Sequence, residues 1–521
     1  MTDTATDDPR LQAAAVGMLV AHWAADRPDT PAVISEFGDL TFAELNAQTN
    51  QFVRGLRSRG LAAGDSIAII GRNRPEWVVA WAACQRAGWR LTTVNWHLTG
   101  EEAAYIVGDC EAKALVCDAR IGDTATGAVS GAPQAEIRVS IGGALAGFEA
   151  FESVIEGQEA SNIVDPSVGG SMLYTSGTTG RPKGVYRPPA SPATVTAVNI
   201  YGYRDENDRH LVTGPLYHAA PLAFSLNAPL AYGCGVVLMD GWDAEDTLRF
   251  IQERKITHTH MVPTMFHRLL SLSDDVRAKY DVSTLRFIIH GAAPCPVPVK
   301  QRLIDWLGPI VLEYYAATEG LGTFVDSNTW LTRPGTVGKP NPEGQVMVGD
   351  DEGNPVAANA IGQVYLKSPA TGKFEYYKDP EKTSSSYRGD YFTLGDVGYM
   401  DDDGYLYLTD RSANLIISGG VNIYPAEVDA ILLTHPAVGD AATIGIPNEE
   451  WGEEVRAVVE LKTGIERSDE LAKEMVAFCR ERLAHYKCPR AVDFIDELPR
   501  QDNGKIYKRW LRDRYRTNGE S

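Results

Sequence analysis

The first half of the chain alternates segments with helical spacing of apolar residues and short, continuous apolar runs. Helix-like and strand-like segments follow one another at 41–59, 66–70, 76–87 and 114–117. The first opens on Thr41-Phe-Ala-Glu44, the pattern of a capping box. The same alternation returns at 235–239, 243–253, 257–261 and 287–289. This rhythm predicts α/β layers built on parallel sheet.

The pattern changes after Pro342, where short strands and frequent turns replace the long alternation. The last part of the chain predicts helices at 425–433 and 468–483 and strands at 441–446 and 454–461. We therefore expect an α/β protein with two domains. Residues 1–411 would form a large N-terminal domain with mixed α/β layers and a β-rich subdomain, and residues 412–521 a small α+β C-terminal domain.

Composition and charge narrow the class of partner. The 521 residues are 44% hydrophobic and 23% charged, as in a soluble globular protein. The formal charge of −20 would repel nucleic acid and anionic lipid, so we expect neither as a general partner. No signal peptide and no apolar run of transmembrane length is present, and seven scattered cysteines without CxxC pairs indicate reduced thiols. These features predict a cytoplasmic protein without an integral membrane segment.

One stretch, Tyr174-Thr-Ser-Gly-Thr-Thr-Gly-Arg-Pro-Lys-Gly184, combines hydroxyls, glycines and two cations directly after an apolar segment. Glycines let a backbone fold around phosphate with its N–H groups inward, and Lys183 or Arg181 adds charge. A flexible surface loop is the ordinary alternative, but it does not explain the fixed order. A Walker P-loop is excluded, because Gly177 and Gly180 are too close together and Gly184 occupies the Ser/Thr position.

The order resembles, residue for residue, the phosphate loop of the adenylate-forming superfamily, which includes acyl- and aryl-CoA synthetases. Further motifs extend the resemblance from about Leu40 to Arg509. It implies ATP, Mg²⁺ and coenzyme A as cofactors and a carboxylic acid as substrate. It assigns ATP binding in this loop to Thr175, Ser176, Gly177, Thr178, Thr179, Gly180 and Lys183.

Three later motifs extend the resemblance through the nucleotide site. Gly291-Ala-Ala-Pro294 is similar to the adenine-side loop and implies contacts from Gly291, Ala292 and Ala293. Glu313-Tyr-Tyr-Ala-Ala-Thr-Glu319 implies that Tyr315 stacks on adenine, Thr318 contacts phosphate, and Glu319, with Thr175, binds Mg²⁺. Gly395-Asp396 and Asp410-Arg411 resemble a ribose clamp of Asp396 and Arg411. Ala316 replaces the usual glycine, and Tyr314 stands where many members have a small residue.

The C-terminal motifs concern catalysis and the acceptor. Pro499-Arg-Gln-Asp-Asn-Gly-Lys505 resembles the loop whose lysine stabilises developing charge during adenylation, which makes Lys505 a catalytic candidate. The resemblance also implies that the small domain is mobile and turns the glycines Gly419 and Gly420 toward the pantetheine arm. The hinge departs from the family, because Ala413 stands where Asp or Lys is usual.

The predicted acyl pocket begins at Pro215-Leu-Tyr-His218, and His218 is as compatible with a wall as with chemistry. Residues 219–227 are apolar and include several small residues, and this region lacks the Phe-Asp pair that holds an α-amine in amino-acid members. These features favour a fatty, aryl or alicyclic acid. With Thr175, Lys183, Glu319 and Lys505, His218 completes the set of catalytic candidates.

Together the motifs predict an AMP-forming acid–CoA ligase. Three alternatives stay open at this point: a ligase that loads a separate acyl-carrier protein or stops at the adenylate, a luciferase-type oxygenase, and a non-catalytic nucleotide-binding homologue. The last would be free to lose the charged motif residues, which are all present here. A homodimer is one oligomeric state that the sequence allows.

Overall fold

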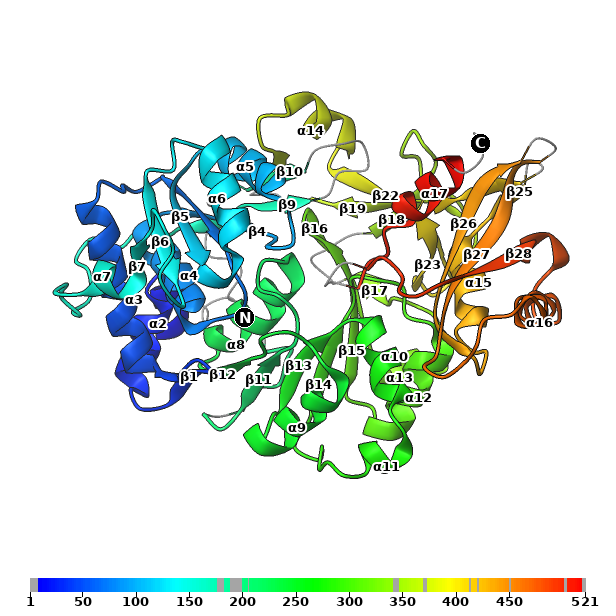
Figure 1. Ribbon diagram of the computed structural model, residues 1–521, viewed down its shortest axis with the longest axis horizontal. Coiled ribbons are helices and arrows are strands. Elements are labelled where there is room, and N and C mark those ends of the chain that lie inside the picture. Colours follow the sequence, from blue (N-terminus) through cyan, green and yellow to red (C-terminus); the bar gives the residue numbers. More distant parts are fainter. Residues whose placement is uncertain are drawn as a thin grey trace. The chain divides into compact units, whose positions relative to one another are not determined.

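The computed structural model describes residues 8–175, 182–187, 199–204, 206–340, 346–368, 373–411, 414–418, 421–448, 451–500 and 504–517. The chain divides into two compact units (Figure 1). The first contains residues 1–261, 272–289 and 369–384, and the second contains residues 262–271, 290–368 and 385–521. This division differs from the boundary expected at 411/412, which stays a prediction.

The first unit contains a parallel sheet in the order β7-β6-β5-β3-β4-β8. Its strands are β3 (Ser66–Ile70), β4 (Arg90–Val94), β5 (Ala112–Asp118), β6 (Ile137–Ile141), β7 (Glu149–Ala150) and β8 (Gly170–Ser171). Helices cover both faces: α3 (Phe42–Ser58), α4 (Pro75–Ala87) and α7 (Phe151–Ile155) one face, α5 (Gly100–Asp109) and α6 (Gly122–Gly131) the other. The predicted α/β layering is confirmed.

Strand β3 shows why a continuous apolar run marked a strand here. Ile67 and Ile69 enter the core with α3 and α4, whereas Ala68 and Ile70 enter the core with α5 and α6. A strand covered by helices on both faces has no polar side. The predicted capping box at the start of α3 is also present, with Thr41 and Glu44 each bonded to the other's backbone N–H.

A second set of strands in this unit runs β14-β13-β11-β12-β1-β2. They are β1 (Pro31–Ile34), β2 (Leu40–Thr41), β11 (Arg209–Val212), β12 (Gly235–Leu238), β13 (His258–Met261) and β14 (Phe287–His290). A three-stranded sheet contains β9 (Leu173–Thr175), β10 (Lys183–Tyr186) and β20 (Glu375–Tyr376). The remaining helices are α1 (Pro9–Ala15), α2 (Leu19–Asp26), α8 (Ala228–Ala231), α9 (Ala244–Arg254) and α11 (Asp274–Arg277), with a π-helix at Pro221–Asn227.

The second unit begins with three helices, α10 (Pro263–Ser271), α12 (Val297–Leu307) and α13 (Ser327–Thr332), and the antiparallel strands β15 (Val311–Ala317), β16 (Gly320–Asp326) and β17 (Lys339–Pro340). A second antiparallel sheet follows, with β18 (Val346–Gly349), β19 (Gly362–Lys367), β21 (Tyr387–Arg388), β22 (Tyr391–Met400) and β23 (Leu406–Arg411). These strands confirm the β-rich part expected after Pro342. Helix α14 (Pro380–Ser386) lies at the junction of the two units in sequence.

The C-terminal residues form the predicted α+β arrangement. Their sheet contains β24 (Ile416–Ser418), β25 (Val421–Ile423), β26 (Val438–Asn448), β27 (Gly452–Leu461) and β28 (Ala491–Ile495). Helices α15 (Pro425–Leu432) and α16 (Asp469–Arg480) share one core with this sheet, and α17 (Lys508–Thr517) contributes to another. None of the helices within the described residues is long and apolar enough to cross a membrane.

Candidate active site

The glycine-rich motif lies at a hairpin in the first unit. Strands β9 and β10 pair antiparallel, and Thr175 lies opposite Lys183 in the register. The intervening candidates Ser176, Gly177, Thr178, Thr179 and Gly180 lie outside the described residues. The structure therefore brings the two ends of the predicted phosphate loop together at the base of a hairpin.

The ammonium group of Lys183 is held at that base by a carboxylate that the motif does not contain. Lys183 Nζ donates to Asp379 Oδ2 at 2.5 Å, and this bond lowers the pKa of Asp379 below its usual value. Asp379 Oδ1 also accepts the backbone N–H of Lys382 in the first turn of α14. Asp379 thus connects the hairpin to the start of α14. An Asp before a helix is expected to cap that helix, but not to bind a lysine elsewhere in the chain.

His218 lies elsewhere in this unit, immediately before the segment expected to line the acyl pocket. Its carbonyl accepts the backbone N–H of Leu222, and the chain continues as the π-helix Pro221–Asn227. π-Helical turns are rare and occur often at functional sites. On this element the Phe224 ring stacks on His260, with centroids 5.8 Å apart and an interplanar angle of 17°. Burial lowers the pKa of His260 to about 3, so the imidazole is neutral at physiological pH.

In the second unit, strand β15 places Tyr315 beside the predicted ribose clamp. Tyr315 donates its hydroxyl to Asp396 Oδ2 at 2.7 Å, and both residues are buried. Asp396 lies on β22 directly opposite Arg411 on β23 in the strand register. Tyr315 and Asp396 are 81 positions apart in the sequence but are in contact in the fold, and the Arg411 backbone pairs with that of Asp396.

The adenine-side loop packs against the same strand. A β-carbon on Gly291 would lie 2.5 Å from the Tyr314 carbonyl oxygen and 2.7 Å from its ring, so only glycine fits there. Ala292 follows with a φ of 68°, the left-handed region. The unusual Tyr314 is 4% exposed and lies against this loop. Ala293, the next candidate in this loop, is partly exposed.

Thr318 and Glu319 form the tip of the β15–β16 hairpin, between the paired residues Ala317 and Gly320. Glu319 is 6% exposed. Mg²⁺ at nucleotide sites is typically held by one or two carboxylates together with substrate phosphates. The carboxylate of Glu319 fits that requirement. No group of three potential metal-binding side chains occurs among the residues that the structure describes, so a cage made of protein alone is not present there.

Lys505 follows a constrained glycine near the C-terminus. Gly504 has a φ of 79°, and a β-carbon on it would lie 2.8 Å from Thr264 Oγ1 at the start of α10. Ile506 forms a β-bridge with Arg500, which closes the loop on its other side. The lysine is thus presented from a loop seated against α10. The candidates Gly419 and Gly420 lie outside the described residues.

Comparison with protein-family models places most of the chain in one family. Residues 20–377 match the AMP-binding enzyme model, and residues 427–505 match the AMP-binding enzyme C-terminal domain. The chain is an AMP-binding enzyme. This assignment confirms the resemblance to the adenylate-forming superfamily and the α/β architecture expected from it.

Three relatives show how far the similarity extends. The chain is 33% identical to a 2-succinylbenzoate–CoA ligase of Bacillus licheniformis, over 95% of this chain and 100% of the relative. It is 32% identical to the fatty acid–[acyl-carrier-protein] ligase ScoC of Streptomyces coeruleorubidus, over 97% of both chains. Among solved structures, the anthranilate CoA ligase AuaEII in complex with anthranoyl-AMP superposes with a TM-score of 0.88 at 26% identity, covering 99% of this chain and 100% of that one.

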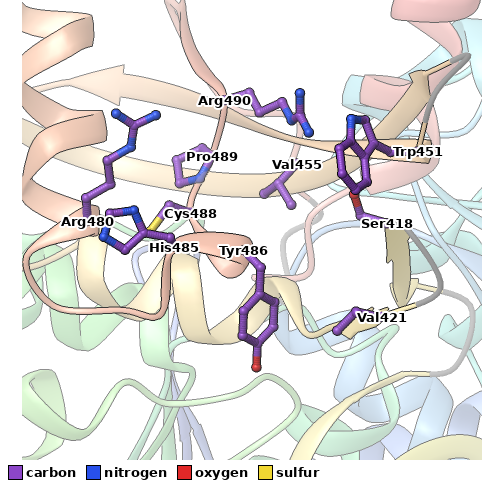
Figure 2. Close-up of a pocket in the computed structure, with 10 residues that line it drawn as sticks. All are labelled: Ser418, Val421, Trp451, Val455, Arg480, His485, Tyr486, Cys488, Pro489 and Arg490. Carbon is purple, nitrogen blue, oxygen red and sulfur yellow. The ribbon is translucent and has the colours of Figure 1, made fainter.

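This AMP-binding enzyme also has a pocket in its C-terminal part that the motifs did not predict. Its volume is about 600 Å³, and the described residues that line it include two arginines and one histidine but no acidic side chain. Arg480 and His485 lie at one end and Trp451 at the other (Figure 2). Trp451 and Tyr486 are 39% and 54% exposed. Ser418 and Val421, which flank the two candidate glycines, belong to the same lining.

Sequence reasoning also missed a buried ion pair beneath the nucleotide motifs. Lys300 on α12 donates to Glu313 Oε2 at 2.5 Å, and the Lys300 side chain is fully buried. Its ammonium also lies 4.8 Å from the Trp330 ring centroid. In the sequence, Glu313 is distinguished only as the first residue of the motif that ends at Glu319. A lysine at helical spacing carries no signal that distinguishes it from a solvated one, so the sequence could not show this pair.

Proposed function

We propose that this AMP-binding enzyme is an ATP-dependent acid–CoA ligase. A substrate carboxylate oxygen attacks the α-phosphorus of ATP, the bond to the β-phosphate breaks, and pyrophosphate leaves. The thiol of coenzyme A then attacks the acyl carbon of the acyl-adenylate, loses its proton to solvent, and displaces AMP. The observation that carries most weight is the buried Tyr315–Asp396 pair on strands next to the Gly291 loop, because it combines an aromatic ring with a carboxylate that can accept from ribose hydroxyls.

The nucleotide-binding roles follow from these positions. Tyr315 stacks on adenine, and its hydroxyl fixes the carboxylate of Asp396 for the ribose hydroxyls. Arg411, whose backbone lies opposite Asp396 in the register, is the second residue that we assign to the ribose clamp. Lys505 stabilises the charge that develops on the α-phosphate and the carboxylate during attack.

The phosphate contacts come from Lys183, from the hairpin loop that begins at Thr175, and from Thr318. Glu319 and Thr175 are the residues that we assign to Mg²⁺. The ion would neutralise charge on the triphosphate and orient it for in-line attack. The protein then acts by positioning and charge neutralisation, without a covalent nucleophile.

The C-terminal pocket supports coenzyme A as the acceptor. Coenzyme A carries several phosphates and an adenine, which require cations and aromatic faces. Arg480 and Arg490 supply guanidinium donors on a chain whose formal charge is −20, His485 supplies a ring N–H, and Trp451 and Tyr486 supply aromatic surface. A pocket of about 600 Å³ is within the range of small-molecule sites.

For the acid, we propose an aryl or other hydrophobic carboxylate. The partly exposed ring of Phe224 on the π-helix is flat and apolar and stacks on the buried, neutral His260, and His218 precedes this helix. Two of the similar proteins are named for aryl acids, 2-succinylbenzoate and anthranilate. A flat wall of this kind accepts an aromatic ring by offset or edge contact.

A second candidate is a ligase that transfers the acyl group to a separate carrier protein. It is favoured by one observation, the similarity over nearly the full length to a fatty acid–[acyl-carrier-protein] ligase. Both acceptors end in phosphopantetheine, but only coenzyme A carries the 3′-phospho-ADP that matches the cationic, aromatic pocket.

The test is pyrophosphate release from Mg·ATP with a panel of benzoates, cinnamates and fatty acids, in the presence of coenzyme A, of a holo-carrier protein, or of neither. Lys505→Ala should abolish turnover, whereas Lys462→Ala, an exposed lysine of the same unit, should not. Turnover only with coenzyme A supports the ligase, and turnover only with the carrier protein supports the second candidate. No pyrophosphate with any acid contradicts both.

We also propose a cytoplasmic location and a homodimer as working assignments. Size-exclusion chromatography with light scattering tests the second, since a mass near 57 kDa instead of twice that value would contradict it.

A further inference from the structure

The loop that carries Lys505 is braced by a guanidinium that belongs to none of the assigned roles. Arg500 Nε and Nη2 contact the two oxygens of Asp440 at 2.5 and 2.6 Å, a bidentate pair. Its third nitrogen, Nη1, donates to the carbonyl oxygen of Gly504 at 2.5 Å. Gly504 is the residue immediately before Lys505, so Arg500 reaches across its own loop to the backbone that orients the lysine.

The same loop is closed by backbone contacts at its ends. Arg500 forms a β-bridge with Ile506, and Tyr507 N–H donates to the Pro499 carbonyl at 2.8 Å. These contacts join the two ends of the loop, but they do not involve the carbonyl group of Gly504. Gly504 has a left-handed φ of 79°, a conformation that glycine leaves nearly as readily as it adopts. The bond from Arg500 to the Gly504 carbonyl holds the peptide group that links Gly504 to Lys505.

Asp440 connects this brace to α10. The residue before it, Gly439, accepts a hydrogen bond from His267 Nε2 of α10 at 2.5 Å. Gly504 packs against Thr264 in the first turn of the same helix. Helix α10 therefore contacts the strand that carries Asp440 and the loop that carries Lys505, and the Arg500–Asp440 pair joins the two contacts.

The pair is well placed to act as a rigid support. The side chains of Arg500 and Asp440 are 17% and 14% exposed, so solvent screens them little. The planar guanidinium of Arg500 is already held by three oxygen atoms, two of Asp440 and one of Gly504, so it loses little further freedom when substrate binds. A lysine on a flexible stem gains most from such support, because its own four-carbon chain does not fix the position of its ammonium.

We propose that Arg500, held by Asp440, is the positioning residue for Lys505 in adenylate formation. The proposal rests on the proposed function, in which Lys505 acts on the first half-reaction. Arg500 itself touches no substrate. Its loss should leave Lys505 present but misplaced, and a displacement of about 1 Å at a catalytic group costs on the order of 100-fold in rate.

The experiment separates the two half-reactions. Adenylation is measured as acid-dependent ATP–pyrophosphate exchange without coenzyme A, using the acid on which the wild type is most active. Thioester formation is measured from the chemically synthesised adenylate of that acid plus coenzyme A. Arg500→Gln should slow the exchange about 10- to 100-fold and leave thioester formation within about threefold of the wild type. Asp440→Asn should give the same pattern, and the double variant should be no slower than Arg500→Gln.

A matched control comes from the neighbouring strand. Arg456 pairs with Glu454 at 2.8 Å, with side chains 22% and 15% exposed, and with Asp493 at 3.5 Å. Both of these partners lie outside the loop that carries Lys505. Arg456→Gln should leave both half-reactions within about twofold. Should Arg500→Gln fail to fold, Arg500→Lys provides the same ratio, because a lysine keeps the charge but not the three-partner fork.

Two results would overturn the proposal. In one, Arg500→Gln has normal exchange. In the other, both half-reactions fall equally, which means that Arg500 only supports the fold. A wild type without exchange on any acid would contradict the proposed function instead, so the two failures are distinguishable.

Discussion

The buried pair Lys300–Glu313 allows the sharpest prediction about stability. Glu313 begins the segment of β15 that leads to Tyr315, and it is 5% exposed. Its carboxylate is compensated by Lys300, whose side chain has no exposure, and His290 Nε2 lies 3.7 Å away. Lys300→Met keeps the length of the aliphatic stem and removes the charge, so it leaves a buried carboxylate without its main partner.

Breaking one side of a buried pair costs about 3–5 kcal/mol, because the remaining charge has lost its solvation and its partner. We therefore expect Lys300→Met to lower the free energy of unfolding by about that amount at pH 8. The double variant Lys300→Met/Glu313→Leu removes both charges, and we expect it to lie within about 1 kcal/mol of the wild type or above it. Lys462→Met, an exposed lysine of the same unit, should have no measurable effect.

The pH dependence gives the charge a signature of its own. Burial raises the pKa of Glu313, and Lys300 opposes that rise, so removing Lys300 raises the folded-state pKa further. A carboxyl with a raised folded-state pKa binds more protons folded than unfolded between its two pKa values, and stability then falls as pH rises through that window. The deficit of Lys300→Met relative to the wild type should be small near the unfolded value of about 4.3 and grow toward pH 8.

Urea unfolding followed by fluorescence and circular dichroism, at a series of pH values, measures these differences. A deficit that is the same at every pH would mean that the lost contacts are packing contacts, including the approach to Trp330. A double variant as unstable as Lys300→Met would contradict the electrostatic argument in the same way.

Three further changes test the nucleotide and acceptor sites. Tyr315→Phe removes the donor to Asp396, and a hydrogen bond to a charged group is worth about 1.5–3 kcal/mol. Steady-state kinetics should therefore show a KM for ATP raised about tenfold or more, with the KM for the acid unchanged. An unchanged KM for ATP would exclude the ribose role. Asp379 competes with nucleotide phosphate for Lys183, and Asp379→Asn removes this competition but keeps the oxygen that caps α14. Because a partly exposed ion pair is worth about 1 kcal/mol at most, nucleotide titration should show an affinity up to about fivefold higher. Weaker nucleotide binding by the variant would refute the competition. Trp451→Ala should raise the KM for coenzyme A about tenfold while acid-dependent ATP–pyrophosphate exchange stays normal, and an equal loss in both would place Trp451 outside the acceptor site.

The architecture could be predicted because its signals are periodic and local. Strand β3 is apolar at every position since both faces are covered, and the capping box at Thr41 needs only residues within one turn. The predicted helix at 468–483 is longer than α16, which runs from Asp469 to Arg480. At its start Ser468 is the N-cap and not a helical residue, and at its end the helix stops before Glu481, which is the C-cap. Helix ends depend on such details and are read less well from sequence.

The support of the site could not be predicted for the opposite reason. Lys183 and Asp379 are separated by 196 positions, and their pairing follows from β10 meeting β20. Nothing near Asp379 distinguishes it from another carboxylate at a helix start. The π-helix at Pro221–Asn227 was likewise visible only as a run of small apolar residues, since its extra residue per turn has no compositional signal.

These two kinds of residue bear differently on the alternative of a non-catalytic homologue. The motif residues Lys183, Asp396 and Lys505 contain the chemistry that the sequence could show, and their presence argues for activity. Each side chain works only in a defined position, and the position of Lys505 depends on Arg500, which donates to the Gly504 carbonyl oxygen beside it. A side chain that orients Lys505 is therefore evidence for catalysis in addition to the charged motif residues themselves. A pseudoenzyme under no demand for adenylation could keep a phosphate-binding loop for nucleotide binding, but it would have no use for a three-partner brace beside Lys505.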